Sequence, residues 1–233
     1  MIRYGQYCPI AKSLELLAER WTLLIVRELL MGSRRFNELR RGMPLIAPSV
    51  MSQRLKLLTN HGIVVREPEP DGGAYEYHLT AAGEELRPLL THLGTWGQRW
   101  SRSNMDAQDL DASFLMWDIR RNVHTDMLPE RAVVFFEFPD AKKGMRHWWL
   151  VVAEGEVDLC LEDPGLEVDI TMVTSLRIMT QIWMGDISLD QARARGLLKL
   201  LGASALVRSL HKWLGPSPFA HVRPAAQGEA VSG

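Results

Sequence analysis

Between residues 32 and 80 the spacing of apolar positions changes, and the change predicts an order of elements. Apolar side chains recur every third or fourth residue along 48–60, which is typical of a helix with one buried face. They alternate along 75–79, which is typical of a half-buried strand, and a second strand is expected over 63–67. The buried stripe of the helix consists of Met51, Leu55 and Leu58.

Helical patterns also flank this stretch. A short helix with Phe36 and Leu39 on its inner face is stopped by Gly42. A longer apolar pattern over 9–25 fits one helix or two helices broken near residues 19–21. Beyond the strands, Thr80 is a suitable N-cap for a helix that runs to about Arg102 and is kinked or weakened near Pro88. A helix, a turn, a second helix and a hairpin are together typical of a winged helix-turn-helix.

The polar face of helix 48–60 has the chemistry of a DNA reader. Hydroxyl and amide groups suit base edges, and cations suit phosphates. The outward residues are Ser49, Ser52, Gln53, Lys56 and Asn60, with Arg54 on the flank. From 34 to 66 there are seven basic residues and one acid, Glu38. The predicted DNA contacts are Arg34, Arg35, Ser49, Ser52, Gln53, Arg54, Lys56 and Arg66.

The helix expected over 80–102 has an apolar stripe that ends in two tryptophans. This is more apolar surface than a small domain needs to cover itself, so we expect a dimer seam shared with the N-terminal helix. The alternative is that the stripe packs within its own chain against a second domain. The stripe consists of Leu86, Leu89 or Leu90, Leu93, Trp96 and Trp100.

Residues 5–102 resemble the HxlR-type regulators, relatives of the MarR winged-helix group. The resemblance rests on Cys8–Pro9, Trp21–Ile25, Arg34–Leu39 and Ser52–Leu58, followed by YEYHLTAAGEELRPLL. It implies a homodimeric bacterial transcription regulator with a double-stranded DNA operator as its partner. The run Ala47–Val50 departs from the more usual helix start of that family, so the base sequence that is read stays open.

The C-terminal half predicts a sheet covered by helices. A helix begins at Phe114 and ends at Pro129, and four strands that we expect to be antiparallel follow. Ser188 and Gln191 form a predicted capping box. The expected strands are 132–138, 147–153, 156–162 and 166–172. The expected later elements are helices 176–184, 189–195 and 206–214, with a strand or bend at 196–201.

The run EVDITMVTSLRIMTQIWMGDISLDQARARGLLKLLG, within 111–214, resembles the sterol-carrier-protein fold. That resemblance implies a pocket for a hydrophobic small molecule, which flexible methionines and large aromatics would suit. The alternative is that these side chains simply form the core. The candidate ligand residues are Trp117, Trp148, Met172, Met179 and Trp183.

Composition supports two domains. The 233 residues are 46% hydrophobic and 24% charged, and the net charge is −1. Residues 1–104 carry 14 Lys and Arg against 10 Asp and Glu, whereas 105–233 carry 13 against 18. We therefore expect a DNA-binding and dimerisation domain over 1–104, a ligand-binding domain over 105–215 and a flexible tail over 216–233. The predicted fold class is α+β, with the winged helix-turn-helix followed by a smaller α/β sterol-carrier-like domain.

Two cysteines, Cys8 and Cys160, form no metal or disulfide pattern, so a reducing cytoplasm is expected. The resemblance to HxlR-type regulators implies that Cys8 is a candidate redox sensor, because some members of that group sense oxidants with a cysteine in this region. Cys8 precedes a helix, with Lys12 one turn on, which suits a reactive thiol; the alternative is an inert thiol. No membrane span, metal site, cofactor site or catalytic motif is evident.

The sequence therefore predicts a cytoplasmic, homodimeric transcription regulator, a repressor that responds to a hydrophobic effector, and not an enzyme. The alternative is a hydrophobic-ligand carrier whose N-terminal half only dimerises.

Overall fold

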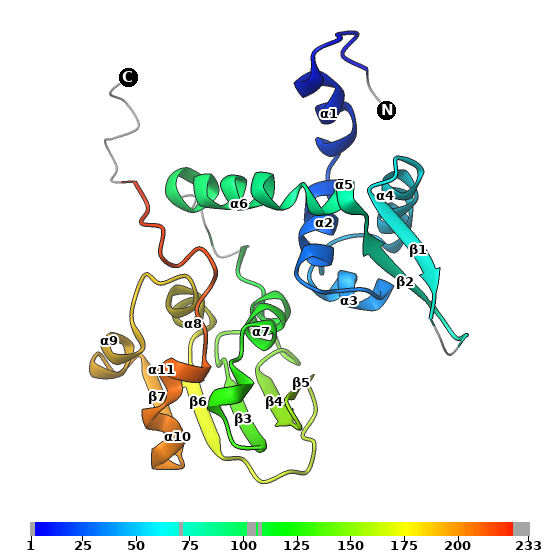
Figure 1. Ribbon diagram of the computed structural model, residues 1–233. Coiled ribbons are helices and arrows are strands. Elements are labelled where there is room, and N and C mark those ends of the chain that lie inside the picture. The colour runs from blue at the N-terminus through cyan, green and yellow to red at the C-terminus, as the bar shows by residue number, and fades with distance from the viewer. Residues whose placement is uncertain (1–2, 70–71, 102–105, 107–108, 226–233) are drawn as a thin grey trace. The chain divides into compact units, whose positions relative to one another are not determined.

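The computed structural model describes residues 3–69, 72–101, 106 and 109–225, and the chain separates into two compact units, Met1–Gly94 and Thr95–Gly233. The first is a helical unit with a two-stranded wing, and the second has a five-stranded mixed sheet with helices (Figure 1). The predicted α+β class and the order of its two parts are confirmed. None of the helices in the described residues is long and apolar enough to cross a membrane.

The N-terminal unit begins with two helices where the sequence allowed one or two. The break falls at Trp21, which has a left-handed φ of 77° and precedes the second helix. A non-glycine residue in this region is strained, so a continuous helix is interrupted there. The elements of the unit are α1 (Pro9–Leu17), α2 (Thr22–Leu30), α3 (Phe36–Arg41), α4 (Pro48–Asn60), β1 (Val64–Pro68), β2 (Tyr75–Leu79) and α5 (Ala81–Glu84), followed by the start of α6 (Arg87–Trp96).

The core of this unit lies beneath α4. Met51, Leu55 and Leu58 are at most 1% exposed and belong to one cluster with Ile25 and Leu29 of α2. The apolar stripe predicted for residues 48–60 is therefore confirmed. Because α2 covers this stripe, the opposite face of α4 stays in solvent.

The helix after the wing is divided, contrary to the single kinked helix that we expected. Thr80 caps α5 as predicted, because its Oγ1 accepts a hydrogen bond from the Gly83 amide at 3.3 Å. The break falls ahead of Pro88, so the proline occupies the first turn of α6, where its missing N–H costs little. After α6 the chain widens into the π-helix η1 (Gly97–Ser101).

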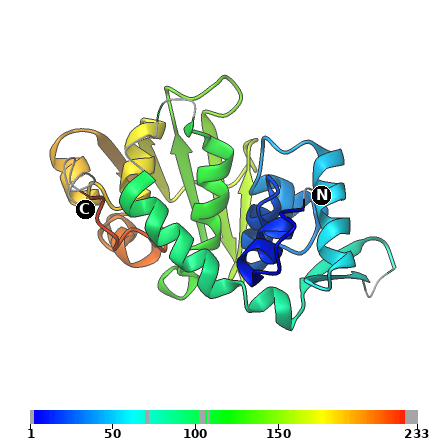
Figure 2. The same ribbon diagram turned by 90° about the horizontal axis from the view of Figure 1, so that it is seen from above.

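In the C-terminal unit the strands form one sheet in the order β5-β4-β3-β6-β7. Helix α7 lies along this sheet (Figure 2) and contacts β5. The elements are α7 (Ala112–Arg121), η4 (Thr125–Met127), β3 (Arg131–Glu137), β4 (His147–Ala153), β5 (Glu156–Cys160), β6 (Ile170–Thr174), α8 (Leu176–Trp183), α9 (Leu189–Ala194), β7 (Leu198–Gly202), α10 (Ser204–Arg208) and α11 (Leu210–Trp213).

The pairing of the sheet corrects one expectation. β3 pairs with β4 in an antiparallel register that places Phe136 opposite Trp148, but it pairs with β6 in parallel, with Val134 opposite Ile170. Alternating side chains indicate which face of a strand is buried and say nothing about the direction of its neighbour. The prediction of antiparallel strands was therefore wrong for the β3–β6 pair.

Several predicted boundaries also differ. The first helix of this half ends at Arg121 and not at Pro129, and a 3-10 turn follows. The strand expected over 166–172 begins only at Ile170. The segment 196–201 contains a strand, β7, and the expected last helix is the pair α10 and α11. The capping box of Ser188 and Gln191 is confirmed by both of its hydrogen bonds.

The chain that follows α11 packs against its own unit as far as the structure describes it. Ser217 donates its amide to the Trp183 carbonyl at 2.8 Å, and Val222 is buried. Ala225 donates its amide to the Arg99 carbonyl at 2.8 Å. Residues 216–225 therefore make contacts within this unit, and residues 226–233 lie outside the described part. The flexible tail expected over 216–233 stays a prediction.

Candidate nucleic-acid interface

The outward face of α4 is polar and accessible. Pro48 occupies the first turn of the helix, and no acidic residue lies in that turn. Hydroxyl, amide and ammonium groups follow one another along this face, opposite the dry stripe of Met51 and Leu55. The exposed residues are Ser49, Ser52, Gln53, Lys56 and Asn60. An α-helix of this width fits a major groove, so this face has the shape and the chemistry of a recognition surface.

Arg54 differs from its neighbours because it folds back onto the protein. Its Nη2 lies 2.8 Å from Oε2 of Glu19, and its Nε donates to the Arg20 carbonyl at 3.1 Å. Only 16% of the Arg54 side chain is exposed. The residue therefore fastens α4 to the turn between α1 and α2, close to the left-handed Trp21.

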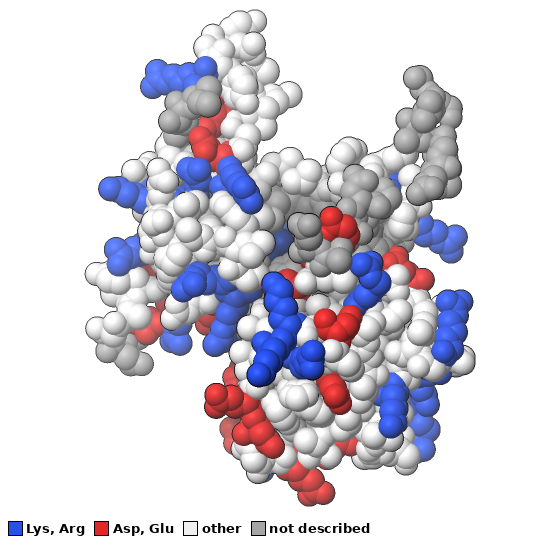
Figure 3. Space-filling model, turned by 180° about the vertical axis from the view of Figure 1, so that it is seen from behind, with Lys and Arg blue, Asp and Glu red and all other residues white. Residues whose placement is uncertain are grey.

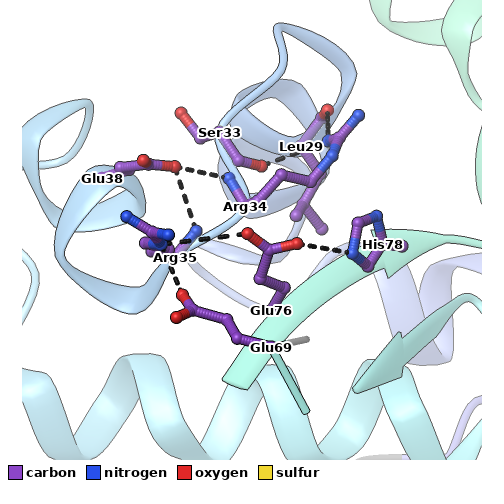
Figure 4. Close-up of polar contacts among 8 residues, drawn as sticks. All are labelled: Leu29, Ser33, Arg34, Arg35, Glu38, Glu69, Glu76 and His78. Atoms are coloured by element: carbon purple, nitrogen blue, oxygen red, sulfur yellow. Dashed lines mark hydrogen bonds and ion pairs between the residues drawn. The ribbon is translucent and has the colours of Figure 1, made fainter. Parts of the chain in front are cut away.

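Arg34 closes the end of α2. Its Nη1 donates to the Leu29 carbonyl at 2.7 Å, where a cation is favoured by the helix dipole. Its backbone N–H donates to Glu38 at 2.7 Å (Figure 4). Its carbonyl accepts from the Tyr77 amide at 2.9 Å. Arg34 thus joins α2, α3 and the wing, and its side chain is partly buried.

Arg35 belongs to a charged network with the wing. Its Nε lies 2.5 Å from Oε1 of Glu69 and 3.8 Å from Oε1 of Glu76 (Figure 4). The hydrogen bond to Glu69 raises the pKa of Arg35 above its ordinary value. Glu76 also contacts Nε2 of His78 at 3.1 Å. Two wing carboxylates therefore surround a residue that we expected to meet DNA phosphates.

A groove of about 570 Å³ lies between α3 and the wing. Its lining includes Phe36, Arg41 and Tyr77, and the guanidinium of Arg66 stacks over the Tyr75 ring at 3.6 Å from the centroid. This cation–π contact orients Arg66, which stays exposed on β1. Of the predicted basic contacts, Arg35 and Arg54 are paired with carboxylates, and the Arg34 guanidinium donates to backbone carbonyls. Lys56 and Arg66 remain exposed, with no carboxylate partner among the described residues.

Sequence reasoning missed the acids that balance this surface. The segment 67–76 contains four acidic residues and no basic residue, and it begins directly after the basic stretch that we counted. Figure 3 shows basic side chains spread over the face of the N-terminal unit and not gathered in a single patch. A charge count extended through the whole hairpin would have found Glu69 and Glu76, whereas Glu19 is paired to α4 only by the fold.

The junction of α2 and α3 is held by a buried ion pair. The Glu28 side chain is fully buried, and its Oε1 lies 2.7 Å from Nη2 of Arg27. The same Nη2 donates to the Gly42 carbonyl at 2.9 Å. This pair fixes the angle at which α3 leaves α2, and therefore the position of the turn that leads into α4.

The five residues predicted to bind a hydrophobic ligand are buried. Each is at most 5% exposed, and four of them belong to the cluster that packs the sheet of the C-terminal unit against its helices. They are Trp117, Trp148, Met172, Met179 and Trp183. Cys8 is the N-cap residue of α1, is partly exposed, and is a free thiol; Lys12, one turn on, pairs with Glu15.

The chain matches known regulators over its N-terminal part. A model of the HxlR-like helix-turn-helix family matches residues 16–105. YvaP of Bacillus subtilis, an HTH-type transcriptional regulator, is 37% identical over 113 residues, which are 48% of this chain and 96% of YvaP. The HTH-type transcriptional regulator sll1512 of Synechocystis is 36% identical over 41% of this chain and 72% of its own.

Among solved structures, the reduced form of the transcriptional regulator YodB from B. subtilis matches 40% of this chain and 93% of its own. Its sequence identity is 32% and its TM-score is 0.36. The family match ends ahead of the five-stranded sheet, and it covers α2 to α6 with the wing between them. This chain therefore belongs to the HxlR-like helix-turn-helix family of DNA-binding transcriptional regulators.

Proposed function

We propose that this regulator reads a near-palindromic operator as a homodimer, with α4 of each copy in a major groove. The observation that carries the proposal is the exposed polar face of α4 above its fully buried stripe. In this arrangement Ser49, Ser52 and Gln53 meet base edges, and Lys56 and Arg66 meet phosphates. Two reading helices related by a twofold axis would lie about one DNA turn apart.

The other three predicted DNA contacts act through their intramolecular partners in this proposal. Arg54 holds α4 against the α1–α2 turn and adds positive charge at its flank. Arg34 and Arg35 hold α3 and the wing together and contribute to the local potential that attracts DNA. Positioning by these arginines matters because base readout depends on the exact angle of the recognition helix.

We further propose that α1 and α6 form the dimer seam. Apolar side chains on both helices are exposed in the single chain, among them Ile10 at 69%, Leu89 at 48% and Leu93 at 48%. Contiguous exposed apolar residues of this size favour a protein partner, and a second copy of the chain provides the same surface. Dimerisation would bring two half-site readers into register.

Repression is the proposed outcome of operator binding, because a dimer on a promoter excludes polymerase from the same DNA. We propose that a hydrophobic effector in the C-terminal unit relieves it, through a sterol-carrier-like pocket. What supports this is the Met- and Trp-rich interior around Met172, Met179 and Trp183. Native mass spectrometry of purified protein tests the proposal; a single unliganded mass in every preparation would contradict it.

We propose a second input at Cys8, a free and partly exposed thiol at the N-cap of α1. Peroxide treatment should lower the operator affinity of the wild type and of Cys160→Ser, and leave Cys8→Ser unchanged. Equal sensitivity of the two variants would refute a sensing role for Cys8.

Operator binding itself is tested by a gel-shift titration across salt concentrations. We expect Gln53→Ala and Arg54→Ala each to cost about 1–3 kcal/mol of specific binding, the former through a lost base contact and the latter through a loosened α4. Arg177→Ala, which removes an exposed arginine of the C-terminal unit, is the matched control. Unchanged affinity in Gln53→Ala would refute the proposed reading face.

A further inference from the structure

A second groove lies within the C-terminal unit, away from the residues assigned above to DNA or to the hydrophobic effector. It has a volume of about 680 Å³, within the range of small-molecule sites. One wall comes from the end of α6 and from η1, and the other from the chain that follows α11. The residues that carry the argument are Arg99, Trp100, His221, Val222, Arg223 and Pro224.

Backbone and amide hydrogen bonds hold the two walls together. Ala225 donates its amide to the Arg99 carbonyl at 2.8 Å, and the buried Gln98 donates Nε2 to the Val222 carbonyl at 3.4 Å. Val222 is 6% exposed and in turn donates its amide to the Phe219 carbonyl at 2.9 Å. The returning segment is therefore part of the folded unit, and the groove is a built feature of it.

The groove begins at the one element of unusual geometry in this region. η1 is a π-helix, and such turns are rare and occur frequently at functional sites. Within it Gln98 is 5% exposed, and its Oε1 has no hydrogen-bond partner among the described residues. A π-turn and a buried side-chain carbonyl that lacks a partner in the described part of the chain both cost stability, so the chain keeps here a conformation that packing alone does not favour.

The charge of the groove has one sign. Arg99, His221 and Arg223 line it and are exposed, and no acidic residue is among its described lining. No carboxylate of the described chain lies within ion-pair distance of either guanidinium. This contrasts with the acidic balance of residues 105–233, which carry 18 acidic and 13 basic residues. Two arginines that face a shared hollow favour an anion, and a carboxylate takes two parallel hydrogen bonds from one guanidinium.

The same groove also offers a flat apolar surface. Trp100 is 40% exposed, and Val222 and Pro224 line the groove beside it. A ring stacked on tryptophan gains contact area that a purely inorganic anion does not. We propose that this groove binds a small carboxylate that carries a planar apolar group, with Arg99 and Arg223 on the carboxylate and Trp100 against the ring.

This site is distinct from the proposed hydrophobic effector pocket, because its recognition is electrostatic and its residues are on the surface. It also differs from the DNA interface, which lies in the N-terminal unit. Arg99, Arg223 and Trp100 therefore have separate, measurable roles in binding, two through charge and one through stacking.

Isothermal titration calorimetry of the full-length protein with 1-naphthoate tests the proposal. We expect saturable binding to the wild type that weakens with added salt, as expected for exposed charges. Binding should fall about tenfold or more in Arg223→Ala and in Arg99→Ala, which is the range for a lost charge-assisted hydrogen bond. Arg177→Ala, an exposed arginine outside the groove, should bind as the wild type does.

Two further ligands separate the parts of the site. The neutral 1-naphthamide should bind much more weakly than 1-naphthoate, and Trp100→Ala should lose naphthoate affinity without changing the weak binding of acetate. Thermal unfolding of each variant shows whether the fold is intact. Absence of naphthoate binding to the wild type, equal binding by Arg223→Ala with an intact fold, or equal affinity for inorganic phosphate would overturn the proposal.

Discussion

Gly42 shows how a single residue can decide the path between two helices of the reading unit. A Cβ atom placed on Gly42 would lie 2.0 Å from the carboxylate carbon of Glu28, which is fully buried and paired with Arg27. Neither partner can give way without leaving a buried charge unpaired. The requirement for glycine here comes from space and not from backbone conformation.

We therefore expect Gly42→Ala to lower the free energy of unfolding by about 1–3 kcal/mol, as an overpacked core does. Gly73→Ala is the matched control, because an added Cβ at Gly73 meets no atom within 4 Å. Urea denaturation of both variants measures the difference. Equal stability of the two would show that Glu28 moves aside freely.

Glu15 ties the first residues of the chain to α1. Hydrogen bonds from Lys12 Nζ and from the Tyr4 amide lower the pKa of Glu15 below its ordinary value of 4.5. The stabilisation that ionised Glu15 gives to the folded state is therefore complete above the ordinary pKa, and it is lost as the pH falls through the lowered pKa. Stability falls on acidification because this carboxylate is more acidic in the folded state than in the unfolded state.

On acidification well below pH 4.5 we expect the Tyr4 amide to become solvent-exposed while the core of the unit stays folded. Amide NMR shifts of residues 3–8, followed during an acid titration, measure this release. In Glu15→Gln the pH dependence of the Tyr4 shift should disappear. A titration curve that is the same in wild type and variant would contradict the assignment.

For single residues, the sequence predicted whether a side chain is buried or exposed better than it predicted which residue that side chain contacts. The helical period was enough to place Met51 inside and Gln53 outside, because both follow from geometry local to α4. The partner of Arg54 is Glu19, 35 residues away, and no local pattern encodes that distance. The burial of Trp117 and Trp183 likewise depends on packing that composition does not reveal.

Among the elements, the wing departs most from the expected picture. Its strands pair in the register Val64 with Leu79 and Arg66 with Tyr77, as a simple hairpin does. The carboxylates of Glu69 and Glu76 nevertheless pair with the exposed Arg35. An acidic wing reduces the number of cations that are available to phosphates, and so weakens the salt dependence of binding.

Glu69→Gln should therefore release charge on Arg35 toward DNA. We expect tighter DNA binding at low salt and a slope of log affinity against log salt that is steeper by about one. Glu84→Gln is the matched control, since that carboxylate pairs with Arg87 on the helices after the wing. Fluorescence anisotropy with labelled operator measures both; a slope that is unchanged or shallower in Glu69→Gln would contradict the expected release.

The order of elements was predictable across nearly the whole chain, while the pairing of strands was not. Capping residues such as Thr80 and Ser188 act over three residues and are readable directly. The parallel pairing of β3 and β6 joins segments separated by β4 and β5, and it depends on how the whole sheet assembles. Short-range signals therefore gave the elements and left the topology open.

For the whole molecule, the sequence left two functions open, a transcription regulator and a hydrophobic-ligand carrier. Membership of the HxlR-like family decides for a DNA-binding transcriptional regulator. The domain boundary that we expected near residue 104 stays a prediction, although compact units meet between Gly94 and Thr95. A sterol-carrier relationship for the C-terminal unit likewise stays a proposal, since the family match ends at residue 105.

The proposed dimer predicts that one charge on α6 separates the copies. Leu93 is 48% exposed, so Leu93→Glu should leave the fold intact while placing two carboxylates in the seam. We expect light scattering to show a monomer and operator affinity to fall with it. Leu45→Glu is the matched control for assembly, because Leu45 is 80% exposed outside α1 and α6. A stable Leu93→Glu dimer would place the seam elsewhere.

The acidic hairpin also limits what an operator for this protein can look like. The carboxylates of Glu69 and Glu76 in the hairpin are repelled by the DNA phosphates, so the hairpin gains little by following the duplex beyond the groove that α4 occupies. Sequence preference should then be concentrated in a few base pairs on each side of the dyad. Substitution of the flanking bases should change affinity little, and protection of the operator from nuclease cleavage should end abruptly at the outer edge of each half-site.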